Sequence, residues 1–170
     1  ALTSFKEVFD TVEENDILQK AFEHRKSHIT SRKTKSSIKF LTSNAKTKDS
    51  RRDGINIFDE VHQFEDDSVV RVMNSGLGKV PQPREVYITT EGVVREGFLD
   101  SLKDDAKDVL NGTIPDSNLF PFICKIDDPD QIHDKENWQM ANPMFTKPMS
   151  DYAKTLFETV EEEYKNLPSG

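Results

Sequence analysis

Hydrophobic residues recur along the chain at two spacings, one typical of helices and one typical of strands. At the start of the sequence they recur every three or four positions, which predicts an amphipathic helix with one buried stripe. Asn15 and Asp16 then offer a break or an N-cap before a second short helix, which is predicted at residues 17–22. The stripe of the first helix consists of Leu2, Phe5, Val8, Phe9 and Val12.

Further along, short apolar runs alternate with helical patterns. Amphipathic helices are predicted at residues 69–73 and 98–110, and a last helix begins after a capping Ser150. Strands that alternate with helices favour an α/β fold with a parallel or mixed sheet. The predicted strands are Ile55–Phe58, Glu85–Thr90 and Leu119–Ile126.

Charge is distributed unevenly. The chain has a formal net charge of -8, yet residues 20–52 hold eleven Lys and Arg against only Glu23 and Asp49. A β-hairpin is predicted within this basic stretch, at residues 28–41. Its cations could bind DNA or nucleotide phosphates through counterion release, or they could simply form a solvated face, and both interpretations stay open. The candidates for DNA contact are Lys33, Lys35 and Lys39.

Length and composition limit the class of protein. The 170 residues suit one ordinary domain, and eleven Phe, three Tyr and one Trp supply enough core material to argue against wholesale disorder. No apolar run approaches the ~20 residues needed to span a bilayer, and the first residues lack the pattern of a signal peptide. We therefore expect an intracellular protein without membrane association.

Two consecutive acids follow the first predicted strand of the α/β region. Asp59 and Glu60 come directly after an apolar run, as the Walker B acids of a P-loop NTPase do. In such a site the first carboxylate holds Mg²⁺, directly or through water, and the second orients and deprotonates the attacking water. A strand that merely ends in two surface acids is the plain alternative.

The next predicted strand ends in a group of small residues. Thr89 and Thr90 would lie beside the acids at the carboxyl edge of a parallel sheet, where ligands bind in this fold class. Hydroxyl groups there can sense a γ-phosphate, and Gly92 lets the backbone turn and shift as the phosphate is lost. About thirty residues separate this group from Asp59, which suits a strand-helix-strand crossover.

Three segments of the chain together match a known pattern in order and spacing: GINIFDEVHQF at Gly54–Phe64, YITTEG at Tyr87–Gly92 and WQMANPMF at Trp138–Phe145. Through them the chain resembles, over nearly its whole length, the large terminase subunits of tailed bacteriophages. The resemblance implies that Asp59 and Glu60 are the Walker B pair and that Thr89, Thr90 and Gly92 belong to the coupling motif, which links ATP turnover to DNA movement.

The resemblance also implies a fold, cofactors and partners. The fold would be a P-loop NTPase of the ASCE type, with a mostly parallel sheet flanked by helices. The intact protein would use ATP and Mg²⁺ to package double-stranded DNA into procapsids, working with a portal protein, a small terminase subunit and sister large subunits. It would act in the cytoplasm of an infected or lysogenic bacterial host.

One departure from the family lies at the front of the chain. The sequence contains no GxxxxGK(S/T) pattern, so we expect that the first strand and the phosphate loop are missing from it. The chain alone is then predicted to lack ATPase activity and to hold no tightly bound cofactor. By motif, residues 1–136 would form the ATPase core portion and 137–170 the tail of that domain, without a nuclease domain.

Other residues allow more than one interpretation. Arg51 and Arg52 could reach a phosphate or a neighbouring subunit, or could be loop charges. His62 is interpreted as a surface histidine rather than a metal ligand, and Trp138 as a buried anchor.

Two further functions also fit. The string Asp59–His62 matches a helicase DExH pattern, and the basic stretch suits a non-enzymatic domain that binds nucleic acid or acidic partners.

Overall fold

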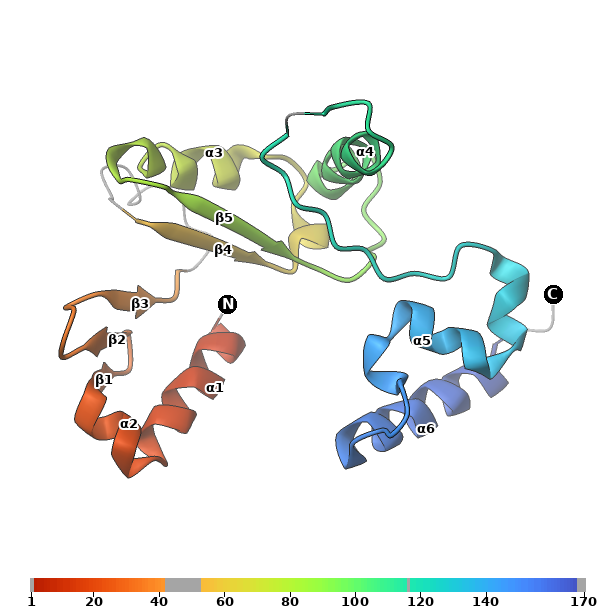
Figure 1. Ribbon diagram of the computed structural model, residues 1–170, viewed down its shortest axis with the longest axis horizontal. Coiled ribbons are helices and arrows are strands. Elements are labelled where there is room, and N and C mark those ends of the chain that lie inside the picture. Colours follow the sequence, from red (N-terminus) through yellow and green to blue (C-terminus); the bar gives the residue numbers. More distant parts are fainter. Residues whose placement is uncertain (1, 42–52, 116, 168–170) are drawn as a thin grey trace. The chain divides into compact units, whose positions relative to one another are not determined.

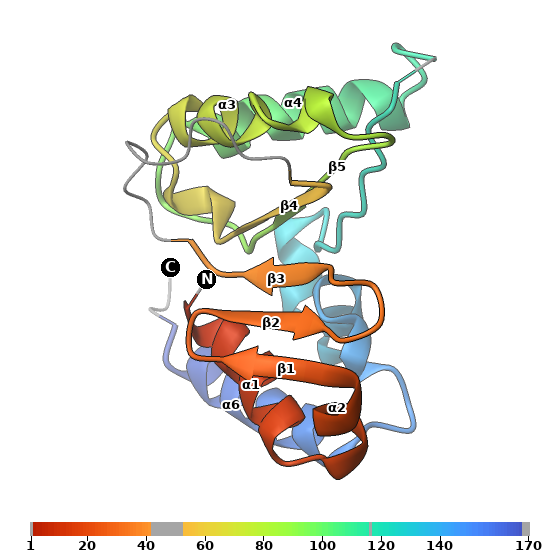
Figure 2. The same ribbon diagram turned by 90° about the vertical axis from the view of Figure 1, so that its left-hand side faces the viewer.

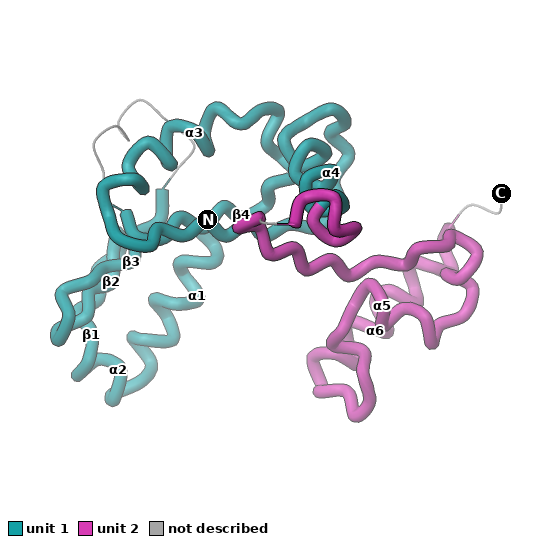
Figure 3. The backbone as a smooth tube through the Cα atoms, turned by 45° about the horizontal axis from the view of Figure 1, so that its top comes forward, with its two compact units in different colours: residues 1–108 teal, residues 109–170 magenta. Residues whose placement is uncertain are grey.

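The computed structural model describes residues 2–41, 53–115 and 117–167. They form two compact units, residues 1–108 and residues 109–170, which Figure 3 colours separately. The boundary of these units is set by packing, whereas the boundary expected after residue 136 was drawn from motifs and stays a prediction. No helix in the described ranges has both the length and the apolar composition that crossing a membrane requires.

The first part of unit 1 combines two helices with a small antiparallel sheet (Figure 2). Helices α1 (Leu2–Glu13) and α2 (Asp16–Ala21) precede strands β1 (Phe22–Arg25), β2 (His28–Ser31) and β3 (Ser37–Lys39), in sheet order β1-β2-β3. The predicted cap is confirmed, because the Asn15 side chain accepts hydrogen bonds from the backbone N–H groups of Ile17 and Leu18. The core of this part consists of Phe5, Val12 and Ile29, with Phe9, Leu18, Phe22 and Phe40 packed around them.

The predicted hairpin is also confirmed, as β2 and β3 pair antiparallel. Strand β1 was not predicted, and it begins at Phe22, where the predicted second helix was expected to end. Leu2 and Val8 were predicted to lie in the buried stripe of α1, but their side chains are 60% and 42% exposed. The helical period identifies the face of a helix correctly, whereas the width of the covered stripe depends on what packs against it.

The second part of unit 1 holds the predicted parallel pair. Strands β4 (Ile55–Asp59) and β5 (Arg84–Ile88) lie side by side in parallel, joined by η2 (Val61–Gln63), α3 (Ser68–Asn74) and η3 (Leu77–Lys79). Helix α4 (Phe98–Leu110) follows β5, and Figures 1 and 2 show α3 and α4 on the same side of the strand pair. This parallel pair flanked by helices confirms the expected α/β class.

One face of the β4–β5 pair carries a core. Phe58, Val61 and Val70 are buried there, and the Phe58 ring stacks on Tyr87 at a centroid distance of 5.2 Å. Asn56 is the one buried polar residue in the described part of the chain, and its amide donates to the Met73 carbonyl at 3.2 Å. This bond fixes the end of α3 to the strand pair. The alternate side chains of the two strands are 40% to 58% exposed, and they are Ile55, Ile57, Val86 and Ile88.

Unit 2 is mostly short helical turns around one aromatic cluster. Trp138 begins α5 (Trp138–Ala141), is 3% exposed and donates its indole N–H to the Ile132 carbonyl at 2.8 Å. Its ring packs against Phe157 and Tyr164 of α6 (Asp151–Lys165), which Ser150 caps as predicted. The interpretation of Trp138 as a buried anchor is confirmed. The remaining turns are η4 (Pro129–His133), η5 (Lys135–Asn137) and η6 (Pro143–Phe145).

The predicted strand at Leu119–Ile126 was wrong. The segment has no regular secondary structure, and no described strand pairs with it. Phe120 and Phe122 are 88% and 80% exposed. A β-prone composition favours extended backbone, but a strand also needs a neighbour to complete its hydrogen-bond ladder, and none of the described residues provides one.

Candidate functional site

The two predicted acids lie where the parallel pair ends. Asp59 is the last residue of β4 and is in register with Ile88, the last residue of β5. Glu60 follows Asp59 out of its strand, and Thr89 follows Ile88 out of the neighbouring one. The β4–β5 register therefore brings these acidic and hydroxyl residues to the same edge of the sheet, the carboxyl edge at which ligands bind in parallel α/β folds.

Glu60 adopts an unusual backbone conformation. Its φ of 55° and ψ of 48° lie in the left-handed region, which costs a non-glycine residue ~1–2 kcal/mol. The conformation turns the chain sharply from β4 into η2, whose first residue, Val61, is fully buried. The buried valine anchors the turn, while the Glu60 side chain stays half exposed. Such outliers cluster at functional sites.

His62 joins the end of β4 to the end of β5. Its backbone N–H donates to the Thr89 hydroxyl oxygen at 3.1 Å, and its ring nitrogen Nδ1 lies 3.0 Å from the same oxygen. Nδ1 also lies 3.1 Å from the Glu60 carboxylate oxygen Oε2. The side chain is only 20% exposed, so the interpretation of His62 as a surface histidine was wrong.

Gly92 packs against the same imidazole. A β-carbon added at Gly92 would lie 2.5 Å from the Cβ of His62 and 2.8 Å from two of its ring carbons. Gly92 does not have a positive φ. The absence of a side chain at position 92 therefore makes room for His62.

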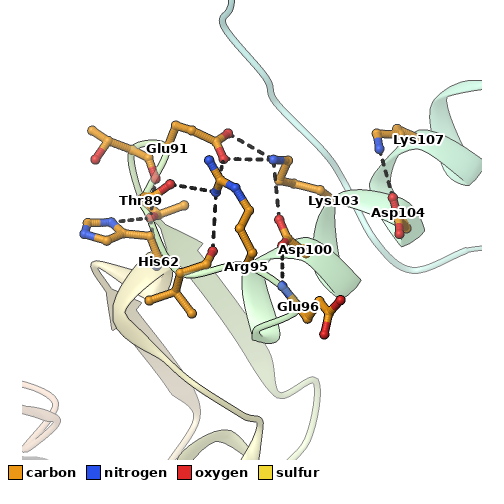
Figure 4. A network of polar contacts seen from close by, with 12 residues as sticks. His62, Thr89, Glu91, Arg95, Glu96, Asp100, Lys103, Asp104 and Lys107 are labelled. Atoms are coloured by element: carbon orange, nitrogen blue, oxygen red, sulfur yellow. Dashed lines mark hydrogen bonds and ion pairs between the residues drawn. The ribbon is translucent and has the colours of Figure 1, made fainter.

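The loop after β5 is held to α4 by a network of charges, shown in Figure 4. The Lys103 ammonium lies 3.0 Å from both carboxylate oxygens of Glu91. The Arg95 guanidinium donates to the Gly92 carbonyl at 2.8 Å and lies 3.4 Å from Glu91. These side chains are partly to largely exposed, so each pair is weak, but together they connect the loop to the helix.

Asp59 accepts a hydrogen bond from the other part of unit 1. The Ser4 hydroxyl of α1 donates to its Oδ2 atom at 2.7 Å, and this bond holds the pKa of Asp59 below its usual range. Partial burial opposes the shift. The Asp59 carboxylate is therefore ionised at neutral pH, the state in which it can bind a cation.

The donor set at this edge fits magnesium. No group of three His, Cys, Asp or Glu side chains in the described ranges could hold a metal ion by itself. Mg²⁺ needs fewer protein ligands, because it usually takes one or two carboxylates together with phosphate oxygens and water. The ionised Asp59 matches that requirement.

The structure gathers some of the predicted site residues and separates others. Thr89 lies within hydrogen-bond range of His62, and the Thr89 hydroxyl donates to the Thr90 carbonyl at 2.7 Å. Thr90 therefore contributes a backbone group to this site, whereas the Thr90 side chain is exposed. Arg51 and Arg52 lie outside the described residues. The three candidates for DNA contact are exposed on or beside the β2–β3 hairpin, and they are Lys33, Lys35 and Lys39.

Comparison with known proteins identifies relatives of this chain. The sequence model of the family described as "Terminase large subunit, ATPase domain" matches residues 1–108. The terminase large subunits of Lactococcus phage p2 and Lactococcus phage SK1 are each 28% identical to the chain over 151 residues, which is 84% of this chain and 28% of theirs. Protein YmfN of Escherichia coli (strain K12) is 32% identical over 87 residues, covering 51% of this chain and 19% of that protein.

A solved structure shares the fold. The crystal structure of the HK97 bacteriophage large terminase matches 92% of this chain with a TM-score of 0.67 at 21% identity, and the match covers 32% of that protein. The chain thus spans about a third or less of the proteins it resembles.

Proposed function

This chain belongs to the terminase large subunit family, through its ATPase domain, and we propose that it is part of a motor subunit that hydrolyses ATP to move double-stranded DNA into a phage procapsid. The observation that carries the proposal is the position of Asp59 and Glu60. They leave β4 at the edge where Thr89 leaves β5, and His62 lies within hydrogen-bond distance of both Glu60 and Thr89. This proximity supports the proposal that the site of hydrolysis and a loop that responds to it are neighbours.

The two acids take different roles in this proposal. Asp59, ionised and at the end of its strand, would hold the magnesium that arrives with the nucleotide, and the ion would supply neutralisation of charge on the phosphate oxygens. Glu60, whose carboxylate is half exposed, orients the attacking water and accepts its proton. Thr89, Thr90 and Gly92 form the loop that responds to the loss of the terminal phosphate.

The phosphate cradle has to come from elsewhere in the protein. A GxxxxGK(S/T) loop supplies the backbone N–H groups and the lysine that hold the β- and γ-phosphates. The 170 residues contain no such sequence. We therefore propose that this chain alone does not hydrolyse ATP and binds neither ATP nor Mg²⁺ tightly.

The family membership supports a set of partners in general terms. We propose that the full-length protein acts on double-stranded DNA with a portal protein, a small terminase subunit and sister large subunits, in the cytoplasm of the bacterial host. The exposed lysines Lys33, Lys35 and Lys39 are the proposed DNA contacts in this chain. The family match favours this proposal over a DExH helicase.

ATP hydrolysis tests the proposal. The full-length protein that contains this chain should hydrolyse ATP, and Glu60→Gln should lower kcat by about 10²-fold or more, because glutamine keeps the shape of the side chain but cannot accept a proton. Glu65→Gln, a few residues further along and exposed, is the matched control and should leave the rate unchanged. The proposal fails if Glu60→Gln hydrolyses ATP at the control rate.

A further inference from the structure

The imidazole of His62 lies between two functional groups that the proposed mechanism treats separately. Its Nδ1 atom is 3.1 Å from the Glu60 carboxylate and 3.0 Å from the Thr89 hydroxyl oxygen. Figure 4 shows the ring pointing at Thr89 from the turn that follows β4. Nδ1 thus faces one oxygen of Glu60, which follows β4, and one oxygen of Thr89, which follows β5.

The proton on that nitrogen follows from the partners of Thr89. A threonine hydroxyl has one hydrogen, and the Thr89 hydroxyl donates it to the Thr90 carbonyl at 2.7 Å. The same oxygen accepts the backbone N–H of His62 and is left as an acceptor towards Nδ1. An ionised carboxylate also only accepts. Both neighbours of Nδ1 are therefore acceptors, so Nδ1 carries the hydrogen.

We infer that His62 is a positioning residue that ties the Glu60 carboxylate to the loop 89–92 through a shared Nδ1–H. The inference rests on the proposed function, in which Glu60 is the base and this loop responds to hydrolysis. Because the Glu60 carboxylate accepts a hydrogen bond from Nδ1–H, its orientation is restrained. Fewer Glu60 rotamers then compete with the one that reaches the attacking water.

Two further contacts make this connection responsive to the loop. Gly92 leaves no space for a β-carbon between the loop and the imidazole, so a movement of the loop towards the ring at this position would displace it. Glu91, next to it, is held by Lys103 of α4. These partly exposed ion pairs join the loop that contacts His62 to α4. In the intact protein, the contact of His62 with the loop makes the position of the base depend on the state of the loop.

The hydrogen on Nδ1 can be observed without turnover. In the full-length protein labelled with ¹⁵N-histidine, the His62 signal, assigned by its loss in His62→Asn, should show a protonated Nδ1. Thr89→Val removes one acceptor and keeps the shape of the side chain, so it should shift that signal. A neutral ring protonated only on Nε2 would overturn the inference, whatever the ATPase activity.

Kinetics test the positioning role. His62→Ala and Thr89→Val should each lower kcat for ATP about tenfold with the KM for ATP changed less than about twofold, because the base is misplaced while nucleotide binding is kept. The double variant should be no slower than either single one, since both remove the same connection. His62→Asn should restore kcat to within about threefold, because an asparagine amide offers N–H donors near the position of Nδ1.

The controls separate this inference from the proposed function. Gln63→Ala, on the same turn and exposed, should behave as the unchanged protein. A Glu60→Gln variant without activity beside His62→Ala and Thr89→Val variants with full activity would overturn the inference and leave the proposed function intact. Strictly additive losses in the double variant, or a His62→Asn variant as slow as His62→Ala, would also overturn it.

Discussion

Gly92 and His62 are in closer contact than any other residue type at position 92 would permit. A β-carbon there would lie 2.5 Å from the Cβ of His62, and real β-carbons essentially never come that close to another atom. The sequence alone favours a role for Gly92 in giving the backbone freedom to turn. The structure gives a different reason for glycine, because the imidazole occupies the space that a side chain would need.

Gly92→Ala should therefore act through His62. The added methyl group forces the imidazole or the loop to move, which should lower the free energy of unfolding by about 1–3 kcal/mol. The same movement should weaken the contact between His62 and Thr89 and reduce ATP hydrolysis in the full-length protein. Denaturant unfolding and steady-state ATPase assays measure the two effects.

Gly78→Ala is the matched control for this prediction. A β-carbon at Gly78 would have no heavy atom within 4 Å, so the change should alter the free energy of unfolding by less than about 0.5 kcal/mol. Equal effects of the two substitutions would contradict the packing argument.

Part of this site could be predicted from the sequence and part could not. Asp59 and Glu60 are adjacent in the chain and end an apolar run, so local pattern alone identified them as candidates. The role of His62 depends on its contact with Thr89, 27 residues away, which exists only because β4 and β5 pair in one particular register. The only local signal was the position of His62, two residues after Glu60, in the DExH-like string.

Asn56→Asp should be among the most destabilising single-atom changes in the chain. The Asn56 amide is 4% exposed and donates to the Met73 carbonyl at 3.2 Å. A carboxylate would place a buried negative charge against that carbonyl oxygen, at a cost of about 3 kcal/mol at pH 7. The new carboxyl would titrate above its ordinary value of ~3.9, so the cost should grow as the pH rises above that value.

Thermal or denaturant unfolding at pH 4 and pH 7 measures this effect. Asn111→Asp, in an exposed turn, adds the same charge without burial and should change the free energy of unfolding by less than about 0.5 kcal/mol. A penalty at Asn56 that is the same at both pH values would contradict the charge argument.

The wrong strand prediction at Leu119–Ile126 has a tertiary cause. The runs that became β4 and β5 are each other's partners, and both were predicted. Leu119–Ile126 also has a β-prone composition but no strand partner among the described residues. Composition reports how well a segment suits extended backbone, while the presence of a partner is a property of the tertiary structure.

Trp138→Phe should destabilise unit 2. Phenylalanine fills less of the cluster with Phe157 and Tyr164, and it leaves the Ile132 carbonyl without the indole N–H. The combined loss should be about 1–3 kcal/mol, measured by circular dichroism during thermal unfolding. Tyr152→Phe on α6, where the ring is 71% exposed, should have almost no effect. Equal melting curves for both variants would contradict this account of the cluster.

Glu161 should make unit 2 sensitive to acid. Its carboxylate accepts hydrogen bonds from Lys135, which contributes most, and from Lys165. These bonds lower the pKa of Glu161 from an ordinary 4.5 to about 2. Because the folded-state pKa lies below the unfolded one, the ion pairs stabilise the fold above pH 4.5, and this stabilisation is lost as the pH falls towards 2. Glu161→Gln removes the charge at every pH. The variant should therefore melt at a lower temperature than the unchanged protein at pH 6, and the difference should shrink between pH 4.5 and pH 2.

Glu162→Gln, exposed on the same helix, should show no such pH-dependent difference. The side chain of Glu161 is partly exposed, so the effect should be small and should weaken further in high salt. A difference between the Glu161 variant and the unchanged protein that stays constant from pH 6 to pH 2 would mean that its ion pairs with Lys135 and Lys165 do not contribute to stability.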